Sequence, residues 1–294
     1  MPAHPKSPYL VPTDGRFKIR DAPHGPPKDA PDGKSCRKKL ERVIERIAEL
    51  QRTFAAHDRH ALLLVFQAMD AAGKDGTIRA VTSGVDPSGF QVSSFKAPSN
   101  EELDHDFLWR CAKRLPERGR IGIFNRSWYE EVLIARVHPG ILDAQRLPPE
   151  KVGPDIWEDR CESIADFERH LARNGTIVLK FFLNVSRDEQ ARRFIARVDD
   201  PEKNWKFSAG DVRQREHWDA YQEAFEYALR RTSTKHAPWY AIPADDKPFM
   251  RLTVARIILE QLESLRLEFP APDAADREEM LTLREQLARE IGEA

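Results

Sequence analysis

The sequence predicts a three-layer α/β/α fold around one parallel sheet, and two observations support this prediction. First, short apolar runs recur along the chain, beginning with residues 61–66, which read Ala, Leu, Leu, Leu, Val and Phe. A strand in which every residue is apolar is typical of a parallel sheet that is covered on both faces. Second, segments with helical spacing separate these runs, and such alternation of strands and helices is typical of doubly wound sheets.

The spacing of apolar residues places the elements in order. A helix is expected from Ser35 to about His57, because apolar residues recur there every three or four positions. It leads directly into the strand at residues 61–66. Further strands of the same kind, or nearly so, are expected at residues 90–95, 120–124, 176–183 and 239–242. The rest of the chain is expected to be helical, from about residue 249 to 267 and from 275 to 291.

Three parts of the chain differ in composition. Residues 1–34 are rich in Pro, Gly, Asp and Lys without periodicity. They are expected to form an extended arm that drapes over the fold or over a neighbour, and disorder is the alternative. Residues 35–270 carry all the expected strands and form the main domain. Residues 271–294 form a highly charged C-terminal helix, which either packs on a partner subunit or is a solvated capping helix.

The charge and the cysteine content argue against several classes of protein. The 47 Lys and Arg residues nearly balance the 48 Asp and Glu residues, so the molecule lacks the overall field of a general nucleic-acid or membrane binder. The three cysteines are scattered and form no CxxC motif, which argues against a disulfide framework or a zinc site. No apolar run approaches the roughly 20 residues of a membrane span. We expect a cytoplasmic protein that binds neither nucleic acid nor membrane.

The segment after the first strand has the character of a phosphate-binding loop. Strand, small-residue loop, Gly-Lys pair and helix together present backbone N–H groups and a helix N-terminus to phosphates, and Lys74 would add a positive charge. The strict motif has Gly at position 68 and Ser or Thr at position 75, where this chain has Ala68 and Asp75. Asp70 is therefore the candidate ligand for Mg²⁺. The expected phosphate-binding residues are Ala71, Ala72, Gly73, Lys74, Asp75, Gly76 and Thr77. A plain strand-to-helix turn is the alternative.

A second candidate segment follows the strand at residues 120–124. Ligands of open α/β sheets bind at the carboxyl ends of strands, so Asn125 and Arg126 are expected to face the same crevice as Lys74. Arg126 would bind a transferring phosphate through both arms of its guanidinium, and Asn125 would orient a metal-bound water or a phosphate oxygen. The alternative is an ordinary helix N-cap with a surface arginine. Glu130 suits a first helical turn for electrostatic reasons alone.

An arginine-rich segment follows the strand at residues 176–183. Ser186 and Glu189 have the spacing of a capping box, so a helix is expected to begin there. In P-loop kinases a helical lid in this place closes over the phosphates and supplies arginines to the transition state. A lid is expected at about residues 184–215, with Arg187, Arg193, Lys203 and Arg215 as its candidate cations. A solvated helix face is the alternative.

Four motifs together resemble those of the type 2 polyphosphate kinase family. They lie at residues 69–77, 124–129 (FNRSWY), 200–207 (DPEKNWKF) and 237–245 (APWYAIPAD), and they follow the family's order. The resemblance runs from about residue 38 to residue 265. It implies a P-loop kinase fold with a parallel sheet and a helical lid, similar to thymidylate kinase, in which residues 35–270 are the phosphotransferase domain.

The resemblance also implies an activity and roles for residues. The family transfers phosphate between inorganic polyphosphate and the nucleotides AMP, ADP and ATP, with Mg²⁺ for which Mn²⁺ would substitute. By position, Lys74 resembles the phosphate-loop lysine, Asp70 the aspartate that organises Mg²⁺, and Arg126 the phosphate-binding arginine. Arg187 and Arg193 resemble the lid arginines. A homo-oligomer, either a dimer or a tetramer, is expected.

The second motif departs from many family members. They have Asp where this chain has Asn125, so this position is not expected to bind Mg²⁺ as a carboxylate would. The Asn-Arg-Ser form followed by Glu130 and Glu131 resembles the subgroup called class III, which accepts both AMP and ADP. Acidic assistance from Glu130 is then expected among the catalytic residues, which are Asp70, Lys74, Asn125, Arg126 and Glu130.

A long polyanion also needs a basic track. Candidates for it are Arg79, Lys96, Arg110, Lys113 and Arg114, although single surface cations need have no function. Two other functions remain open. An ATP-dependent nucleoside-monophosphate or small-molecule kinase would need an adenine pocket for its donor, for which no motif is found. A regulator that only binds nucleotide or polyphosphate could dispense with Asp70 and Lys74 together, yet both are present.

Overall fold

Strands and helices alternate along the chain as the apolar spacing predicts. The structure is a computed structural model that describes residues 4–293. Its first long helix, α1 (Gly33–His57), leads into β1 (Ala61–Ala68). The other strands are β2 (Phe90–Ser94), β3 (Ile121–Asn125), β4 (Thr176–Asn184) and β5 (Trp239–Pro243). All the strands expected from the sequence are therefore confirmed.

The strands form one parallel sheet in the order β2-β3-β1-β4-β5. In the middle of the sheet, β1 and β4 are buried along almost their whole length. β2 differs from the expectation of a strand covered on both faces, because it lies at the edge and leaves Val92 43% exposed. The parallel order brings the carboxyl ends of β1 and β3 side by side, which is where ligands bind in such sheets.

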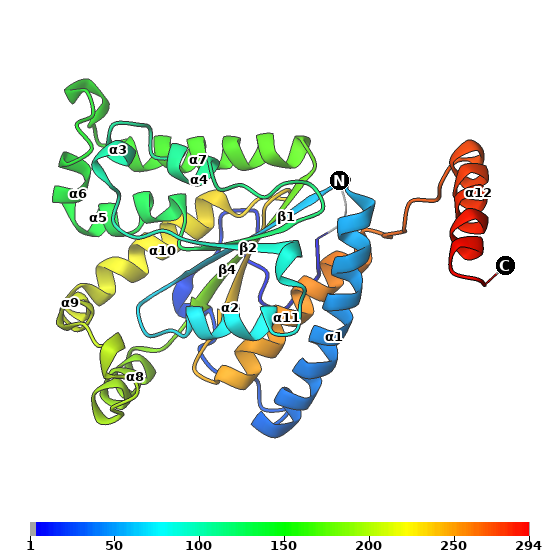
Figure 1. Ribbon diagram of the computed structural model, residues 1–294. Coiled ribbons are helices and arrows are strands. Elements are labelled where there is room, and N and C mark those ends of the chain that lie inside the picture. Colours follow the sequence, from blue (N-terminus) through cyan, green and yellow to red (C-terminus); the bar gives the residue numbers. More distant parts are fainter. Residues whose placement is uncertain (1–3, 294) are drawn as a thin grey trace.

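Helices cover both faces of the sheet and give the predicted three layers (Figure 1). On one face α1 packs against α11 (Lys247–Ser264), which also packs against α2 (Lys74–Thr82). On the other face α7 (Ile156–Arg173) packs against α10 (Trp218–Thr232). Short helices connect these elements: α3 (Asn100–Leu103), α4 (Trp109–Ala112), α5 (Ile134–Val137) and α6 (Pro139–Asp143).

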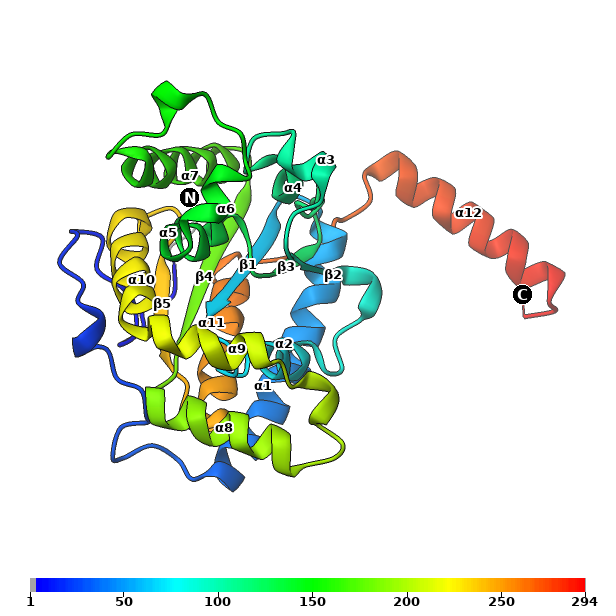
Figure 2. The ribbon, with the colours of Figure 1, turned by 90° about the vertical axis from the view of Figure 1, so that its left-hand side faces the viewer.

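The expected lid segment is helical and lies beyond the carboxyl end of β4 (Figure 2). It contains α8 (Arg187–Asp199) and α9 (Ala209–Arg213). Ser186 caps α8, since its hydroxyl accepts a hydrogen bond from the N–H of Glu189 at 3.2 Å. In a full capping box the N–H of Ser186 would donate to the side chain of Glu189. Here it donates to the side chain of Asp245 instead, at 2.8 Å.

The described part of the N-terminal arm packs along β5. Tyr9 accepts a hydrogen bond from the N–H of Ala241 at 2.8 Å, and the N–H of Val11 donates to Trp239 at 2.9 Å. Val11 and Ile19 are buried in the main core. Residues 4–32 therefore drape over the fold, as one of the two sequence readings expects. Residues 1–3 of the predicted arm lie outside the described residues.

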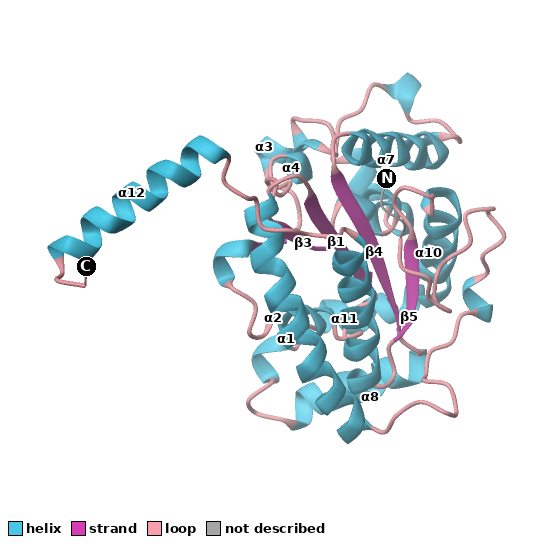
Figure 3. Ribbon diagram, turned by 90° about the vertical axis from the view of Figure 1, so that its right-hand side faces the viewer, coloured by secondary structure: helices cyan, strands magenta, loops and turns pink. Residues whose placement is uncertain are grey.

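The C-terminal helix α12 (Ala274–Glu290) projects away from the rest of the molecule (Figure 3). None of its described residues is buried, and Met280, Leu281, Leu283 and Leu287 are all exposed. Both expectations for this helix, contact with a partner subunit and a solvated capping helix, stay predictions. Across residues 4–293, no helix combines the length and the apolar character needed to cross a membrane.

Candidate active site

The loop between β1 and α2 has a constrained backbone. Ala71 and Gly73 have positive φ angles of 62° and 102°, in the left-handed region that favours glycine. Such a conformation costs an alanine on the order of 1 kcal/mol. At Gly73 a Cβ atom would also lie 3.2 Å from Cε of Met250. The surroundings must therefore hold this loop in place.

The first turn of α2 offers hydrogen-bond donors to a ligand. Among the described residues, no acceptor receives the backbone N–H groups of Gly73, Lys74, Asp75 and Gly76. Free N–H groups at a helix N-terminus, together with the helix dipole, form a site for phosphate. Thr77 differs from the expected phosphate contact. Both its N–H and its hydroxyl donate to the carbonyl of Gly73 at 3.0 Å, so its polar groups are used within the helix.

Arg193 on α8 holds the phosphate loop. Its side chain is only 7% exposed, and its Nε donates to Glu189 at 2.9 Å. Its two terminal nitrogens donate, over 2.5 to 3.2 Å, to the main-chain carbonyls of Ala71, Ala72, Ala244 and Asp245. The sequence predicts an arginine that reaches toward the phosphates. The structure instead directs Arg193 to carbonyls of the loop and of the turn after β5, which both lie beside it.

The other expected lid cations take different positions. Arg215 donates to the carbonyl of Arg187 at 3.0 Å and to the side-chain oxygen of Gln190 at 2.7 Å, so it braces the lid. Gln190 in turn donates to the carbonyl of Asp70 at 2.9 Å. The side chain of Arg187 is exposed, and Lys203 pairs with Asp200 at the surface. Sequence reasoning missed Gln190, because a glutamine in a charged helix carries no signal.

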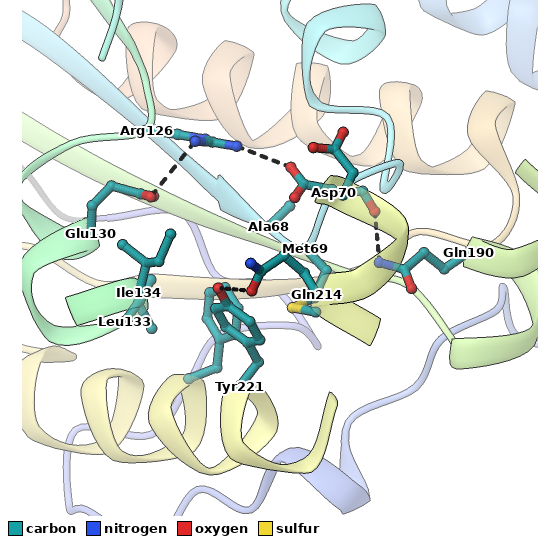
Figure 4. A pocket seen from close by; sticks show the side chains of 12 residues that line it. Ala68, Met69, Asp70, Arg126, Glu130, Leu133, Ile134, Gln190, Gln214 and Tyr221 are labelled. Atoms are coloured by element: carbon teal, nitrogen blue, oxygen red, sulfur yellow. Dashed lines mark hydrogen bonds and ion pairs between the residues drawn. The ribbon is translucent and has the colours of Figure 1, made fainter. Parts of the chain in front are cut away.

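Arg126 lies beside the phosphate loop, as predicted. Its φ of 65° turns the chain sharply after β3, and its N–H donates to the carbonyl of Phe66 on β1 at 3.1 Å. The guanidinium lies 3.0 Å from Asp70 and 4.0 Å from Glu130 (Figure 4). Burial opposes its charge, but the carboxylates of Glu130 and Asp70 outweigh burial and raise the pKa of Arg126. The site therefore holds a permanent positive charge next to the loop.

Asn125 and Lys74 complete this edge of the site. The amide nitrogen of Asn125 donates to the carboxylate of Asp75 at 2.8 Å. Asp75 stands where the strict loop motif has Ser or Thr, and Asn125 stands where many members of the resembled family have Asp. These two departures are thus paired with each other. Lys74 is half-buried at the start of α2. Burial, followed by the charge of Arg126, lowers the pKa of Lys74, so a bound anion would stabilise its charged form.

A pocket opens beside Asp70 and Arg126 (Figure 4). Its polar lining comes from Asp70, Arg126, Glu130, Gln190, Asp211 and Gln214, and its apolar lining from Ala68, Met69, Leu133, Ile134, Tyr221 and Phe225. Gln214 is oriented by two partners, since its side-chain oxygen lies 3.0 Å from the Tyr221 hydroxyl and 2.6 Å from Nε2 of His138. A pocket with a charged end and an apolar wall suits a flat ligand that carries an anionic group.

Two carboxylates in this pocket suit a magnesium ion. Asp70 and Asp211 both line it, and burial, followed by the charge of Asp70, raises the pKa of Asp211. Among residues 4–293, no three His, Cys, Asp or Glu side chains converge to hold a metal by themselves. Mg²⁺ is usually bound by one or two carboxylates with waters and substrate phosphates. The residues therefore fit a metal that enters with phosphate, with Asp70 as its candidate ligand.

P-loop phosphotransferases share two features with this site. A Gly-Lys loop joins the first strand of a parallel sheet to the following helix, and an arginine stands at the end of the neighbouring strand. The fold and the site place this protein in that class. A model of the polyphosphate kinase 2 family matches residues 31–270. The chain belongs to this family.

Proteins similar to this chain carry names that agree with the family. The ADP-polyphosphate phosphotransferase of Rhodopseudomonas palustris is 55% identical over 251 residues, which cover 85% of this chain and 87% of the relative. The AMP/ADP-polyphosphate phosphotransferase of Meiothermus ruber is 44% identical over 268 residues, or 91% and 96% of the two chains. A crystal structure of polyphosphate kinase 2 from Arthrobacter aurescens superposes with a TM-score of 0.82 at 36% identity, covering 95% of this chain and 99% of that one. The predicted family and fold are confirmed.

Proposed function

We propose that the protein transfers the terminal phosphoryl group of inorganic polyphosphate to AMP and ADP, and that it runs the transfer in both directions. One observation carries this proposal. Asp70 and Arg126 lie at the junction of two binding regions, the free N–H groups of the phosphate loop and the pocket with an apolar wall. A donor phosphate and an acceptor nucleotide can therefore meet at the same guanidinium.

The residues of the chain have separable roles in this reaction. The N–H groups of Gly73 to Gly76, with Lys74, bind the terminal phosphates of the donor. The apolar wall at Tyr221 and Phe225 holds the nucleobase of the acceptor, whose phosphate points toward Arg126. A Mg²⁺ ion, bound with the phosphates at Asp70, would neutralise charge on the transferring group. Phosphoryl transfer has a loose transition state, so placement and charge neutralisation supply most of the catalysis.

The test is nucleotide production without a nucleotide donor. Purified protein with polyphosphate, Mg²⁺ and ADP should form ATP, and omission of polyphosphate should abolish the product. A second arm offers ATP with a nucleoside monophosphate and no polyphosphate. Transfer in that arm alone would favour an ATP-dependent kinase. Binding of both ligands without product in either arm would favour a regulator.

Both AMP and ADP are expected to accept phosphate. Asn125 and Glu130 carry the form of the second motif expected of the subgroup with both acceptors, and a relative named for both acceptors is 44% identical to this chain. The two acceptors are to be assayed separately, with AMP freshly freed of ADP and the products separated by chromatography. Strict rejection of AMP would limit the proposed function to ADP.

The donor track is best placed on α11, beside the phosphate loop. The guanidinium of Arg251 lies against Gly76, where a Cβ atom would be 2.9 Å from its terminal nitrogen. Burial, then the charges of Arg79 and Arg193, lower the pKa of Arg251. Its Nε is buried and has no hydrogen-bond partner among the described residues. Arg193 is already paired with Glu189, whereas Arg79 and Arg251 repel each other and form no ion pair with a carboxylate among the described residues. Two such cations suit a polyanionic ligand.

Three of the basic residues that the sequence offers for this track are placed elsewhere. Arg110 is buried, donates to the carbonyl of Lys96 at 2.8 Å and pairs with Glu131 at 3.5 Å. Lys113 and Arg114 are exposed, but they follow α4, which lies at the opposite end of the molecule from α8 (Figure 2). The reason is topological, because the chain returns there toward the amino end of β3.

Salt dependence tests the track. In Arg79→Ala/Arg251→Ala, KM for long polyphosphate should rise, and the slope of log KM against log salt should flatten by roughly one to two units, by analogy with counterion release from nucleic acids. Turnover at saturation should change little, because these cations contribute binding that is equal in ground and transition states. Short polyphosphate should show a shallower slope than long polyphosphate in the parent protein.

The control variant is Lys113→Ala/Arg114→Ala, which removes the same two charges at the far end of the molecule. It should behave as the parent does. The track on α11 would have to be abandoned if the two double variants flattened the slope equally, or if neither did. The predicted dimer or tetramer, the cytoplasmic location and the choice of Mg²⁺ over Mn²⁺ stay predictions.

A further inference from the structure

We propose that Glu168 is a positioning residue, which acts through Trp128 and Tyr129 to hold Arg126 in its left-handed conformation beside the phosphate loop. Glu168 belongs to a cluster of polar side chains in the core, and no step of the transfer uses this cluster directly. The positioning role rests on the proposed function only where activity is the readout.

The cluster is built around a fully buried ion pair. Lys180 on β4 and Glu168 on α7 are both 0% exposed, and their charged atoms lie 2.5 Å apart. Lys180 also donates to the Tyr129 hydroxyl at 2.9 Å and to the carbonyl of Thr232 at 2.7 Å. Its ammonium group lies 5.2 Å from the centre of the Trp239 ring. The charge on Lys180 is thus balanced from several directions.

Glu168 receives hydrogen bonds from two consecutive residues of the second motif. The Tyr129 hydroxyl donates to its Oε1 at 2.8 Å, and the indole N–H of Trp128 donates to the same oxygen at 3.3 Å. Both aromatic rings are 0% exposed. Oε1 of Glu168 therefore helps to fix the positions and orientations of both rings, which follow Arg126 in the chain.

Arg126 needs such support. It stands two residues before Trp128 and has a φ of 65°, which is unfavourable for a side chain as large as arginine. Conformations of this kind persist when the surrounding structure over-determines them. On one side, the N–H of Arg126 is bonded to Phe66 of β1. On the other side, the Ser127 hydroxyl accepts from the N–H of Tyr129 at 3.2 Å, and the two rings lead to Glu168.

Stability alone is a poor reason for this cluster. Removing two charges from water is costly, and replacing a buried ion pair with apolar residues of similar size is often neutral or stabilising. An apolar pair would fill the same space between α7 and β4. It would not provide an acceptor for Trp128 and Tyr129. The acceptor is therefore the feature that a positioning role requires and that a purely packing role does not.

Two double variants separate these roles. Glu168→Gln/Lys180→Met removes both charges and keeps a side-chain oxygen as the acceptor. Glu168→Leu/Lys180→Met removes the same charges and the acceptor as well. Both variants lose the bonds from Lys180 to Thr232 and to Tyr129, so that they differ only at position 168, where Gln keeps an acceptor oxygen beside its amide NH2 group and Leu has no polar group. Thermal melting monitored by circular dichroism establishes that each one is folded.

The expected result is a difference in kcat between the folded variants. The Leu/Met variant should turn over about 10- to 100-fold more slowly than the Gln/Met variant, because displacing a catalytic group by about 1 Å costs that much. KM for the nucleotide should be similar in both. Hydrogen exchange of a peptide that contains residues 124–130, measured without substrates, should be faster in the Leu/Met variant. This readout is independent of activity, so it separates failure of the inference from failure of the proposed function.

Equal kcat and equal exchange in the two folded variants would overturn the proposal. If either double variant does not fold, Tyr129→Phe decides, because it keeps the ring and the ion pair and removes one of the two donors. It should lower kcat severalfold in a protein that is still folded, although its melting temperature should fall, because Lys180 and Glu168 each lose a buried hydrogen-bond partner. Parent-like kcat and exchange in folded Tyr129→Phe would then overturn the proposal.

Discussion

Lys74→Ala is expected to lower kcat about 10²-fold or more, because removing a group that stabilises transferring charge costs about 3 kcal/mol or more of transition-state stabilisation. Lys74 begins α2, at the turn that follows β1, and it is half-buried at the edge of the site. It lies outside the hydrophobic core, so the melting temperature should change little. ATP formation from ADP and polyphosphate at saturating concentrations measures the loss.

Asp70→Asn should cause a loss of similar size by another route. The substitution removes the charge that faces Arg126 at 3.0 Å and the candidate ligand for Mg²⁺. Raising the Mg²⁺ concentration should partly restore Asp70→Asn, but it should not restore Lys74→Ala. Lys113→Ala serves as the control for the loss of a lysine. Near-normal turnover in either site variant would remove the proposed mechanism.

Arg193→Lys is expected to reduce kcat about 10²-fold through displacement of the phosphate loop. Lysine keeps the charge but cannot reach four carbonyls and Glu189 at once, since it lacks the planar fork of arginine. Hydrogen exchange of residues 69–77 without substrates should therefore become faster. Stability should fall by about 1 to 3 kcal/mol, the usual cost of leaving buried groups unpaired.

The control for this prediction is the neighbouring arginine. Arg192 is exposed and pairs with the same Glu189 at 3.2 Å, and Arg192→Lys should change stability by no more than about 0.5 kcal/mol. If Arg193 acted on the transition state as an ordinary lid arginine, its substitution would lower kcat without changing exchange in the loop. That outcome would restore the role expected from the sequence.

The local features of the site were predictable because they depend on residues that are close in the chain. The apolar runs that become β1 and β4 predict buried parallel strands, and the Gly-Lys pair after β1 predicts the phosphate loop. The placement of Arg126 beside Lys74 followed from a general rule for the carboxyl ends of parallel strands. It needed no knowledge of side-chain contacts.

The sequence did not predict the contacts of side chains that had a choice of partners. Arg110 and Arg193 look like free cations in the sequence, yet both are buried against acceptors supplied by distant segments. Thr77 looks like part of a phosphate motif, yet its hydroxyl is used within α2. Residue type and spacing do not specify which carbonyl or carboxylate lies nearby after folding.

The sequence by itself determined the order of strands and helices along the chain, the position of the Gly-Lys loop between β1 and α2, and the family. Only the tertiary structure decided which side chains surround that loop. Asp211 on α9 and Tyr221 on α10 both line the pocket, although they are distant in the chain from the loop, and Glu168 meets Lys180 because α7 packs on β4. Hydrophobic periodicity specifies which face of an element is buried. It does not specify which distant element covers that face, and pairing of buried polar groups depends on that contact.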